Sequence, residues 1–184
     1  MKKETNKIKT VRQIDRDFIS YAVPIIQSGG LRETCAIRQH GSTTRFSHCV
    51  SVAYYSLRVA TCLKIPFKAK SLVTGGLLHD YYFYDRRSEN ISQLKNSFIH
   101  PKVAAHNAMR DYAVSPEEEN IILRHMFPIT LIPPEHLEGF IVCVTDKICG
   151  LAETFGKNKV PLPDCAELWH GGERSPNVTP RRPL

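Results

Sequence analysis

Apolar side chains recur every three or four residues along most of this chain, and that spacing predicts α-helices. No stretch has the strict alternation of a half-buried strand, and no internal repeat is visible. The sequence therefore predicts an all-α protein. Apolar spacing and helix-start signals together place six helices at about residues 11–27, 43–63, 67–81, 101–112, 116–125 and 133–152.

Local signals set the ends of several predicted helices. Ser42 or Thr43 is placed to act as the N-cap of the second helix. Pro101 suits the first turn of the fourth helix, so residues 82–98 are predicted to form a polar, irregular loop. The last helix is predicted to open at Pro133-Pro134-Glu135 and to carry an apolar stripe made of Phe140, Ile141, Val144, Ile148, Leu151 and Ala152.

A length of 184 residues suits a single domain with tails. Residues 1–10 are predicted to be a polar tail, and residues 11–155 contain all the predicted helices. Residues 156–184 contain five prolines and no periodicity, so this segment is predicted to be irregular or disordered. Its composition leaves open whether it is native to the domain.

The net charge of +7 is concentrated at the two ends of the chain. Residues 1–16 carry a net charge of +4 and residues 157–184 one of +2, which leaves +1 for the middle. Solvated tails account for this distribution better than a basic binding surface does. Specific nucleic-acid binding is therefore not expected.

Cysteine usage and hydropathy indicate a cytoplasmic protein with no membrane partner. No apolar run approaches the length of a bilayer span, and no apolar segment of a secretory signal follows the basic N-terminus. The six cysteines form no C-x-x-C pair, so neither a zinc ribbon nor a disulfide framework is indicated. Small buried thiols in a reducing compartment are predicted for the four cysteines that fall in helical patterns: Cys49, Cys62, Cys143 and Cys149.

Adjacent His79 and Asp80 lie where the third predicted helix ends. Metal sites in helical bundles are built by inward-pointing side chains from several helices, and imidazole with carboxylate suits several divalent ions. Two adjacent residues cannot share a face in mid-helix, but at a helix end both can turn towards one ion. The other candidate ligands are spread over the remaining helices: His48, His100, His125 and Asp146.

Three strings carry a resemblance to a known superfamily: Arg45-Phe46-Ser47-His48, Leu77-Leu78-His79-Asp80 and Val144-Thr145-Asp146-Lys147. In this order they resemble the HD-domain superfamily of metal-dependent phosphohydrolases, over about residues 39–153. The chain is most similar to small bacterial HD or HDIG hydrolases and to bacterial diadenosine tetraphosphate hydrolases. It departs from the HDIG string at Tyr81-Tyr82, and it lacks the glycine-tyrosine-proline motif of cyclic-di-GMP phosphodiesterases.

The resemblance implies an HD-type helical bundle with a metal site in its core. By this resemblance His48, His79 and Asp146 would hold a first divalent ion, His100 and His125 would hold a second, and Asp80 would bridge them. Iron or manganese would be the first choice, with zinc, nickel, cobalt and magnesium as alternatives. His40, His106, His136 and His170 are expected to lie outside the ligand set.

The implied activity is hydrolysis of a nucleotide or another phosphate ester by a metal-activated water. Asp80, Arg45 and Lys147 would be catalytic, and Arg45, Arg124 and Lys147 would bind substrate phosphate; each cation also has a simpler interpretation as a helix-surface charge. The alternatives are a mixed-valent di-iron oxygenase of the same fold and a non-catalytic metal- or ligand-binding module. The sequence is silent on oligomeric state, and a homo-oligomer remains open.

Overall fold

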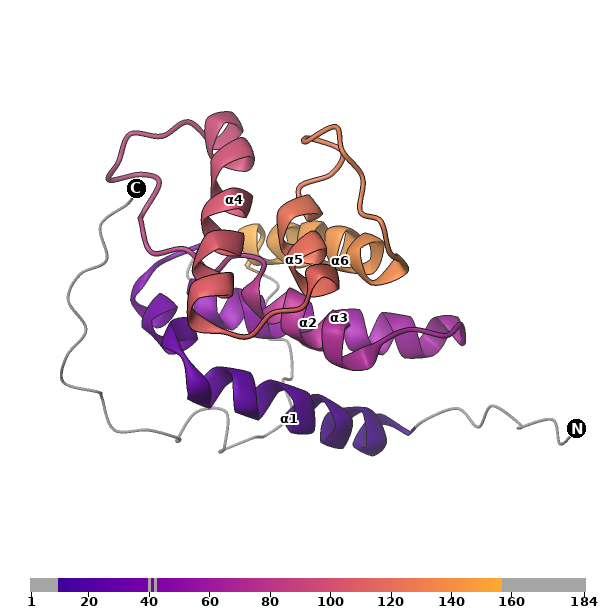
Figure 1. Ribbon diagram of the computed structural model, residues 1–184. Coiled ribbons are helices and arrows are strands. Elements are labelled where there is room, and N and C mark those ends of the chain that lie inside the picture. The colour runs from indigo at the N-terminus through magenta and orange to yellow at the C-terminus, as the bar shows by residue number, and fades with distance from the viewer. Residues whose placement is uncertain (1–9, 40, 42, 157–184) are drawn as a thin grey trace, which may run out of the picture.

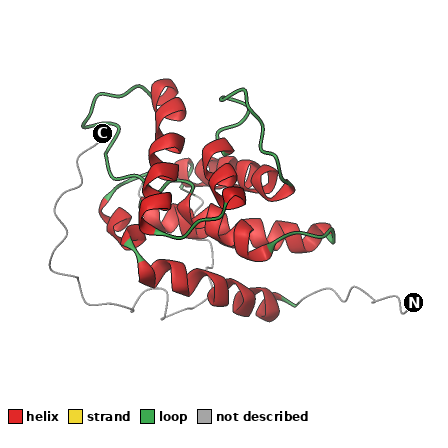
Figure 2. Cartoon of the chain, in the orientation of Figure 1, coloured by secondary structure: helices red, strands yellow, loops and turns green. Residues whose placement is uncertain are grey.

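The computed structural model describes residues 10–39, 41 and 43–156, and regular structure in this part is helical (Figure 2). An isolated bridge between Arg38 and Thr44 is the β-type pairing found there. The predicted all-α class is confirmed. The elements follow the order α1 (Val11–Ser28), the 3-10 helix η1 (Gly30–Ala36), α2 (Arg45–Leu63), α3 (Ala69–Leu78), α4 (Gln93–Asp111), α5 (Pro116–Arg124) and α6 (Leu137–Thr154).

Several sequence predictions fall outside the described residues. These are the predicted tails at residues 1–9 and 157–184, and the expectations for His40, Ser42 and His170.

The helices α2 and α3 form the centre of the bundle, with α1 below them and α4, α5 and α6 above in the view of Figure 1. Small residues let α3 approach its neighbours closely. A Cβ atom on Gly76 would lie 2.8 Å from the Cα atom of Ala53 in α2, and one on Gly75 would lie 2.6 Å from Cγ2 of Ile121 in α5. The C-terminal end of α3 is therefore fixed between two helices, and this is the end that carries His79 and Asp80.

Thr44 caps α2, in place of the predicted Ser42 or Thr43. Its side chain accepts a hydrogen bond from the Ser47 amide at 3.2 Å, so the helix begins at Arg45. At the other end of the chain, α6 begins only at Leu137, with His136 as its N-cap. The prediction that Pro133-Pro134-Glu135 opens this helix is wrong by one turn.

The loop after α3 is shorter than predicted. Ser92 accepts a hydrogen bond from the Lys95 amide at 3.3 Å and caps α4, which starts at Gln93. Pro101 consequently lies inside α4 and not in its first turn. The first turns of α4 are mostly polar and have no apolar stripe, so apolar spacing could not reveal them.

The apolar stripe predicted for α6 combines two faces of the helix. Ile141 is buried, whereas Phe140, Val144, Ile148 and Leu151 expose between 40 and 65% of their surface. The core-facing side is completed by Val142, Cys143 and Cys149. The prediction of one core-facing stripe is wrong because α6 is apolar on both sides, and hydrophobic spacing alone does not separate them.

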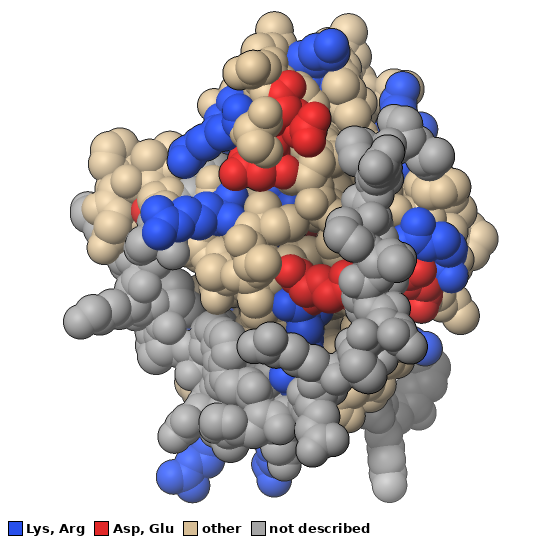
Figure 3. All heavy atoms as spheres, turned by 90° about the vertical axis from the view of Figure 1, so that its left-hand side faces the viewer, with Lys and Arg blue, Asp and Glu red and all other residues tan. Residues whose placement is uncertain are grey.

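Cys49, Cys143 and Cys149 are buried free thiols, as predicted, but Cys62 is exposed near the end of α2. None of the helices in the described residues has the length and apolarity that a membrane span requires. On the face shown in Figure 3, Lys and Arg side chains lie beside Asp and Glu side chains. This mixed pattern agrees with a middle region whose net charge is only +1.

Candidate metal centre

The six predicted ligand residues meet in the middle of the bundle, although they come from five different helices. Each occupies a position that its helix fixes: His48 in the first turns of α2, His79 and Asp80 in the turn that ends α3, His100 within α4, His125 at the end of α5, and Asp146 within α6. His79 is the C-cap of α3 and keeps helical dihedral angles, and the chain then tightens into a turn in which the Tyr81 amide donates to the Leu78 carbonyl at 3.1 Å.

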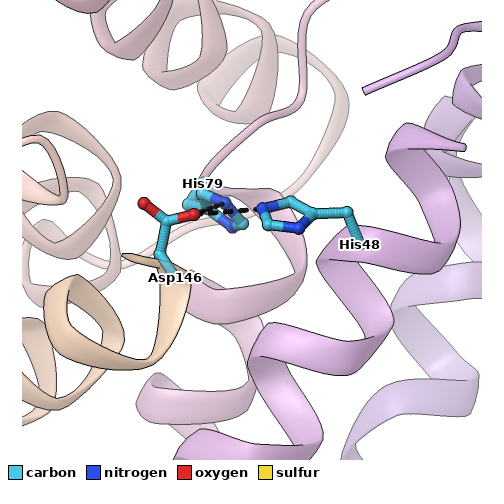
Figure 4. A group of neighbouring side chains, drawn as sticks. All are labelled: His48, His79 and Asp146. Atoms are coloured by element: carbon cyan, nitrogen blue, oxygen red, sulfur yellow. Dashed lines mark hydrogen bonds and ion pairs between the residues drawn. The ribbon is translucent and has the colours of Figure 1, made fainter. Parts of the chain in front are cut away.

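One group of donor atoms consists of His48, His79 and Asp146 (Figure 4). Nε2 of His48 lies 3.0 Å from Oδ1 of Asp146, and Nε2 of His79 lies 3.5 Å from the same oxygen. The donor atoms of this group all lie within 4.8 Å of one another, and His48 and His79 are fully buried. This is a compact set of three side chains that could hold one metal ion.

A second group shares His79 with the first and adds Asp80 and His125. Oδ2 of Asp80 lies 3.7 Å from Nε2 of His79, and Oδ1 lies 3.8 Å from Nε2 of His125. His100 borders this group, with its Nε2 atom 3.2 Å from Oδ1 of Asp80. The two carboxylate oxygens of Asp80 thus face different histidines, which is the arrangement expected of a bridging carboxylate.

Every one of these imidazoles is held through Nδ1, so that Nε2 points to the centre. Because the Nδ1 partners are carbonyl or carboxylate oxygens, each Nδ1–H donates, as is usual for metal-binding histidines. The partners and distances are Glu153 Oε2 for His48 (2.8 Å), the Gly76 carbonyl for His79 (2.8 Å), the Asn96 carbonyl for His100 (2.7 Å) and the Ile122 carbonyl for His125 (2.7 Å).

The Nε2 atoms of His100 and His125 lie only 2.8 Å apart. With Nδ1 donating on both rings, two neutral imidazoles present lone pairs to each other at this distance, and only a proton or a cation between them makes the contact favourable. Burial lowers the pKa of His125 to about 3, assisted by the charges of His79 and His100, and burial also lowers the pKa of His100. A metal cation therefore fits this position better than a proton.

Two buried polar atoms at the centre have no hydrogen-bond partner among the described residues: Nε2 of His79 and Oδ1 of Asp80. Buried polar atoms are normally satisfied, and such exceptions often mark an ion or ligand position. Asp80 stays ionised there. Burial raises its pKa, but nearby histidine charge, that of His79 first, outweighs burial and lowers the pKa below its ordinary value. The donor set thus fits one or two divalent ions.

Comparison with known protein families matches residues 45–151 to the HD domain. The chain belongs to the HD-domain family. The match covers more than half of the chain and all six predicted ligands. Comparison with curated proteins and with solved structures found no match, so the predicted similarity to diadenosine tetraphosphate hydrolases stays a prediction.

A cavity of about 550 Å³ opens onto the candidate metal centre of this HD domain. Asp80, His100, His125 and Asp146 line it, whereas His48 and His79 lie behind them. Among the described residues, the lining carboxylate outside the donor groups is Asp85. Cationic side chains outnumber it: Arg38, Arg45, Arg86, Arg87 and Lys147.

The three cations predicted to bind substrate differ in position within the HD domain. Lys147 lines the cavity, and its ammonium group donates to the His125 carbonyl at 2.9 Å. Arg45 also lines the cavity but is 2% exposed. Arg124 is half-buried and is not among the residues that line the cavity. The HD-domain structure therefore offers no support for substrate contact by Arg124.

Sequence reasoning missed two polar residues that hold candidate ligands of this HD domain in place. Glu153 is 2% exposed and bonds to His48, and it lies seven residues after Asp146, which puts both on one face of α6. That spacing was a usable signal. Gln39 lies in the segment before α2 and donates a hydrogen bond to Asp80, and no local sequence pattern indicates this contact. His106 and His136 are exposed and lie outside the site, as expected.

Proposed function

We propose that this protein is a metal-dependent phosphohydrolase that cleaves a nucleotide or another phosphate ester at a binuclear site. The observation that carries the proposal is the convergence of four Nδ1-anchored imidazoles on Asp80 and Asp146. His48, His79 and Asp146 would hold one ion, His100 and His125 the other, and Asp80 both. Iron and manganese suit these nitrogen and oxygen donors, as do zinc, nickel, cobalt and, less well, magnesium.

When bound, ions of this kind lower the pKa of coordinated water and neutralise phosphoryl oxygens. The protein's own contribution is to fix the ligand atoms and to supply further positive charge. Asp80 is ionised and held at the cavity floor, where it can serve both ion positions. Asp80 is the residue on which catalysis would depend most. One of its oxygens faces His79 and the other faces His100, and no other carboxylate in the described residues is shared between the two ion positions in this way.

Lys147 is the cation proposed to meet substrate phosphate charge directly. It lines the cavity beside Asp146, and 37% of its side chain is exposed. Arg45 contributes from the cavity wall, and Arg38, Arg86 and Arg87 add positive charge around it. A cavity of about 550 Å³ with this lining suits a small phosphorylated molecule such as a nucleotide.

Metal analysis and phosphate release test the proposal together. Protein prepared anaerobically is assayed for bound metal and then for phosphate release from a panel of nucleotides and phosphate esters. Asp80→Ala should abolish phosphate release. Asp85→Ala, which removes a cavity carboxylate outside both donor groups, should retain most of it.

The same six nitrogen and oxygen donors, without a thiolate, also suit a di-iron centre that activates dioxygen. About two iron atoms per chain with oxygen uptake and no phosphate release would overturn the hydrolase proposal in favour of an oxygenase. Metal binding with neither activity would favour a metal- or ligand-binding module.

A further inference from the structure

Gln39 lies on a short turn before α2 whose backbone is firmly held. The backbone amide of Gln39 donates to the Thr43 carbonyl at 2.9 Å, and the backbone amide of Arg45 donates to the Ile37 carbonyl at 2.8 Å. The bridge between Arg38 and Thr44 belongs to the same turn. The backbone position of Gln39 is therefore set by α2, independently of the metal ligands.

The side chain of Gln39 joins Arg45 to Asp80, and its orientation is determined. Nε of Arg45 donates to Oε1 of Gln39 at 2.8 Å. A guanidinium group can only donate, so the carbonyl oxygen of the Gln39 amide must face Arg45. The NH2 group then faces Asp80 and donates to its Oδ2 atom. No rotation of the amide by 180° satisfies both neighbours.

Arg45 is itself anchored on the segment that follows α3. Its Nη1 atom donates to the carbonyls of Tyr82 at 2.7 Å and Tyr84 at 3.2 Å, and its guanidinium carbon lies 3.5 Å from the centre of the Tyr82 ring. With these contacts and an exposure of 2%, Arg45 acts as a fixed support. Gln39 is thus held at its oxygen end and donates at its nitrogen end.

The contact with Gln39 decides how Asp80 presents its two oxygens. Holding Oδ2 keeps Oδ1 turned towards Nε2 of His100 at 3.2 Å and of His125 at 3.8 Å. Without the side-chain amide of Gln39, the Asp80 carboxylate could rotate about its Cβ–Cγ bond, and its two oxygens would no longer face separate ion positions. The group made of His48, His79 and Asp146 does not depend on Gln39. In the described residues His48 bonds to Glu153 and Asp146, and no hydrogen bond joins Gln39 to this group.

We propose that Gln39 is a positioning residue that orients Asp80 for shared use by two ions, so that it controls occupancy of the position bordered by His100 and His125. This inference rests on the binuclear site of the proposed function. It adds that a residue outside the HD signature determines whether one ion or two are bound.

The test is a Mn²⁺ binding isotherm on the full chain, with free Mn²⁺ measured by its electron paramagnetic resonance signal. Wild-type protein should bind two ions. Gln39→Ala and Gln39→Glu should each retain one ion with unchanged affinity and bind the second about 10- to 100-fold more weakly. Gln39→Glu is the sharper variant, since it keeps the acceptor for Arg45 and the side-chain length while removing the donor to Asp80.

Gln93→Ala is the matched control, because Gln93 lines the same cavity and lies on α4. It should bind two ions as the wild type does. Equal weakening of both ions in the Gln39 variants, together with a lower melting temperature, would show a merely structural role and overturn the inference. The inference would also be overturned if the Gln39 variants bound two Mn²⁺ ions with wild-type affinities, or if the wild type bound only one. If the wild type binds two ions, the Gln39 variants lose only the second, and no substrate releases phosphate, the proposed hydrolase activity is wrong and this inference still holds.

Discussion

His48 lies between two carboxylates, and this position makes its imidazole unusually basic. Burial lowers its pKa, but hydrogen bonds and charges from Asp146 and Glu153 outweigh burial and raise the pKa to about 10. Without a metal, His48 is therefore a cation at neutral pH that donates to both carboxylates. A group whose pKa is raised on folding stabilises the fold fully below its ordinary pKa, and the contribution is lost as the pH rises towards 10.

An ion that binds His48 must displace this proton. We expect metal uptake at neutral pH to release about one proton at the His48 group, with an apparent affinity that rises about tenfold per pH unit below pH 10. Calorimetric titration with Mn²⁺ at pH 7.5, in two buffers of different ionisation enthalpy, measures the released proton. Binding heats that are identical in both buffers would contradict the expectation.

Glu153→Gln separates the contribution of charge from that of the hydrogen bond. The amide oxygen still accepts from Nδ1 of His48, but the loss of one negative charge lowers the pKa of His48. Proton release at pH 8.5 should therefore fall. Glu138→Gln is the control, since Glu138 is a buried glutamate on the same helix that bonds instead to the Lys68 amide.

The helix α3 has little room for a larger side chain where it packs against α2. A Cβ atom on Gly76 would meet backbone of α2 at 2.8 Å, which a side-chain rotation cannot relieve. Gly76→Ala should therefore lower the free energy of unfolding by about 1–3 kcal/mol, measured in urea. Because the displaced helix ends at His79 and Asp80, Mn²⁺ affinity should fall as well.

Lys70→Ala, an exposed change on the same helix, should stay within about 0.5 kcal/mol of the wild type. A Gly76→Ala variant as stable as Lys70→Ala would mean that α2 and α3 can separate at no cost.

The two apolar faces of α6 provide a matched pair of isoleucines. Ile141 is 5% exposed and Ile148 is 62% exposed. Ile141→Ala removes buried methyl groups and leaves a cavity, so it should cost about 2–5 kcal/mol of unfolding free energy. Ile148→Ala should cost about 0.5 kcal/mol or less. Similar losses for both, measured by urea unfolding, would show that the exposed face is covered in solution.

The sequence could predict what each helix contributes but not every contact between them. The types and order of the six candidate ligands are distinctive in the sequence, and the structure brings their side chains together in the bundle. The role of Gln39 could not be predicted, because its partner Asp80 lies 41 residues away and a single glutamine has no sequence signal that separates it from a surface residue. The face of α6 was misjudged because both of its sides are apolar, and only packing against α2 and α5 decides between them.

At the scale of the whole molecule, the donor groups link folding to metal. Most of the candidate ligands are far apart in the unfolded chain, so a divalent ion held by these groups would bind the folded state and stabilise it. Mn²⁺ at 100 times its dissociation constant should add about 2.7 kcal/mol to the free energy of unfolding. The measurement is the melting temperature with Mn²⁺ and then with excess chelator, which should reverse the rise.

Asp146→Ala removes the carboxylate of the first group and should show a smaller rise in melting temperature. A wild-type melting temperature that is indifferent to Mn²⁺ and to chelator would argue against an ion in the bundle core.

The helix α6 supplies Asp146 and Glu153 to a site whose first histidine lies at residue 48. During synthesis, an emerging chain presents His48 and His79 well before the carboxylate that completes their group. At about 5–20 residues per second, the ribosome needs several seconds to cover that interval. The complete donor set exists only once α6 has been made, so an ion held by all six side chains would bind after the other helices have been synthesised.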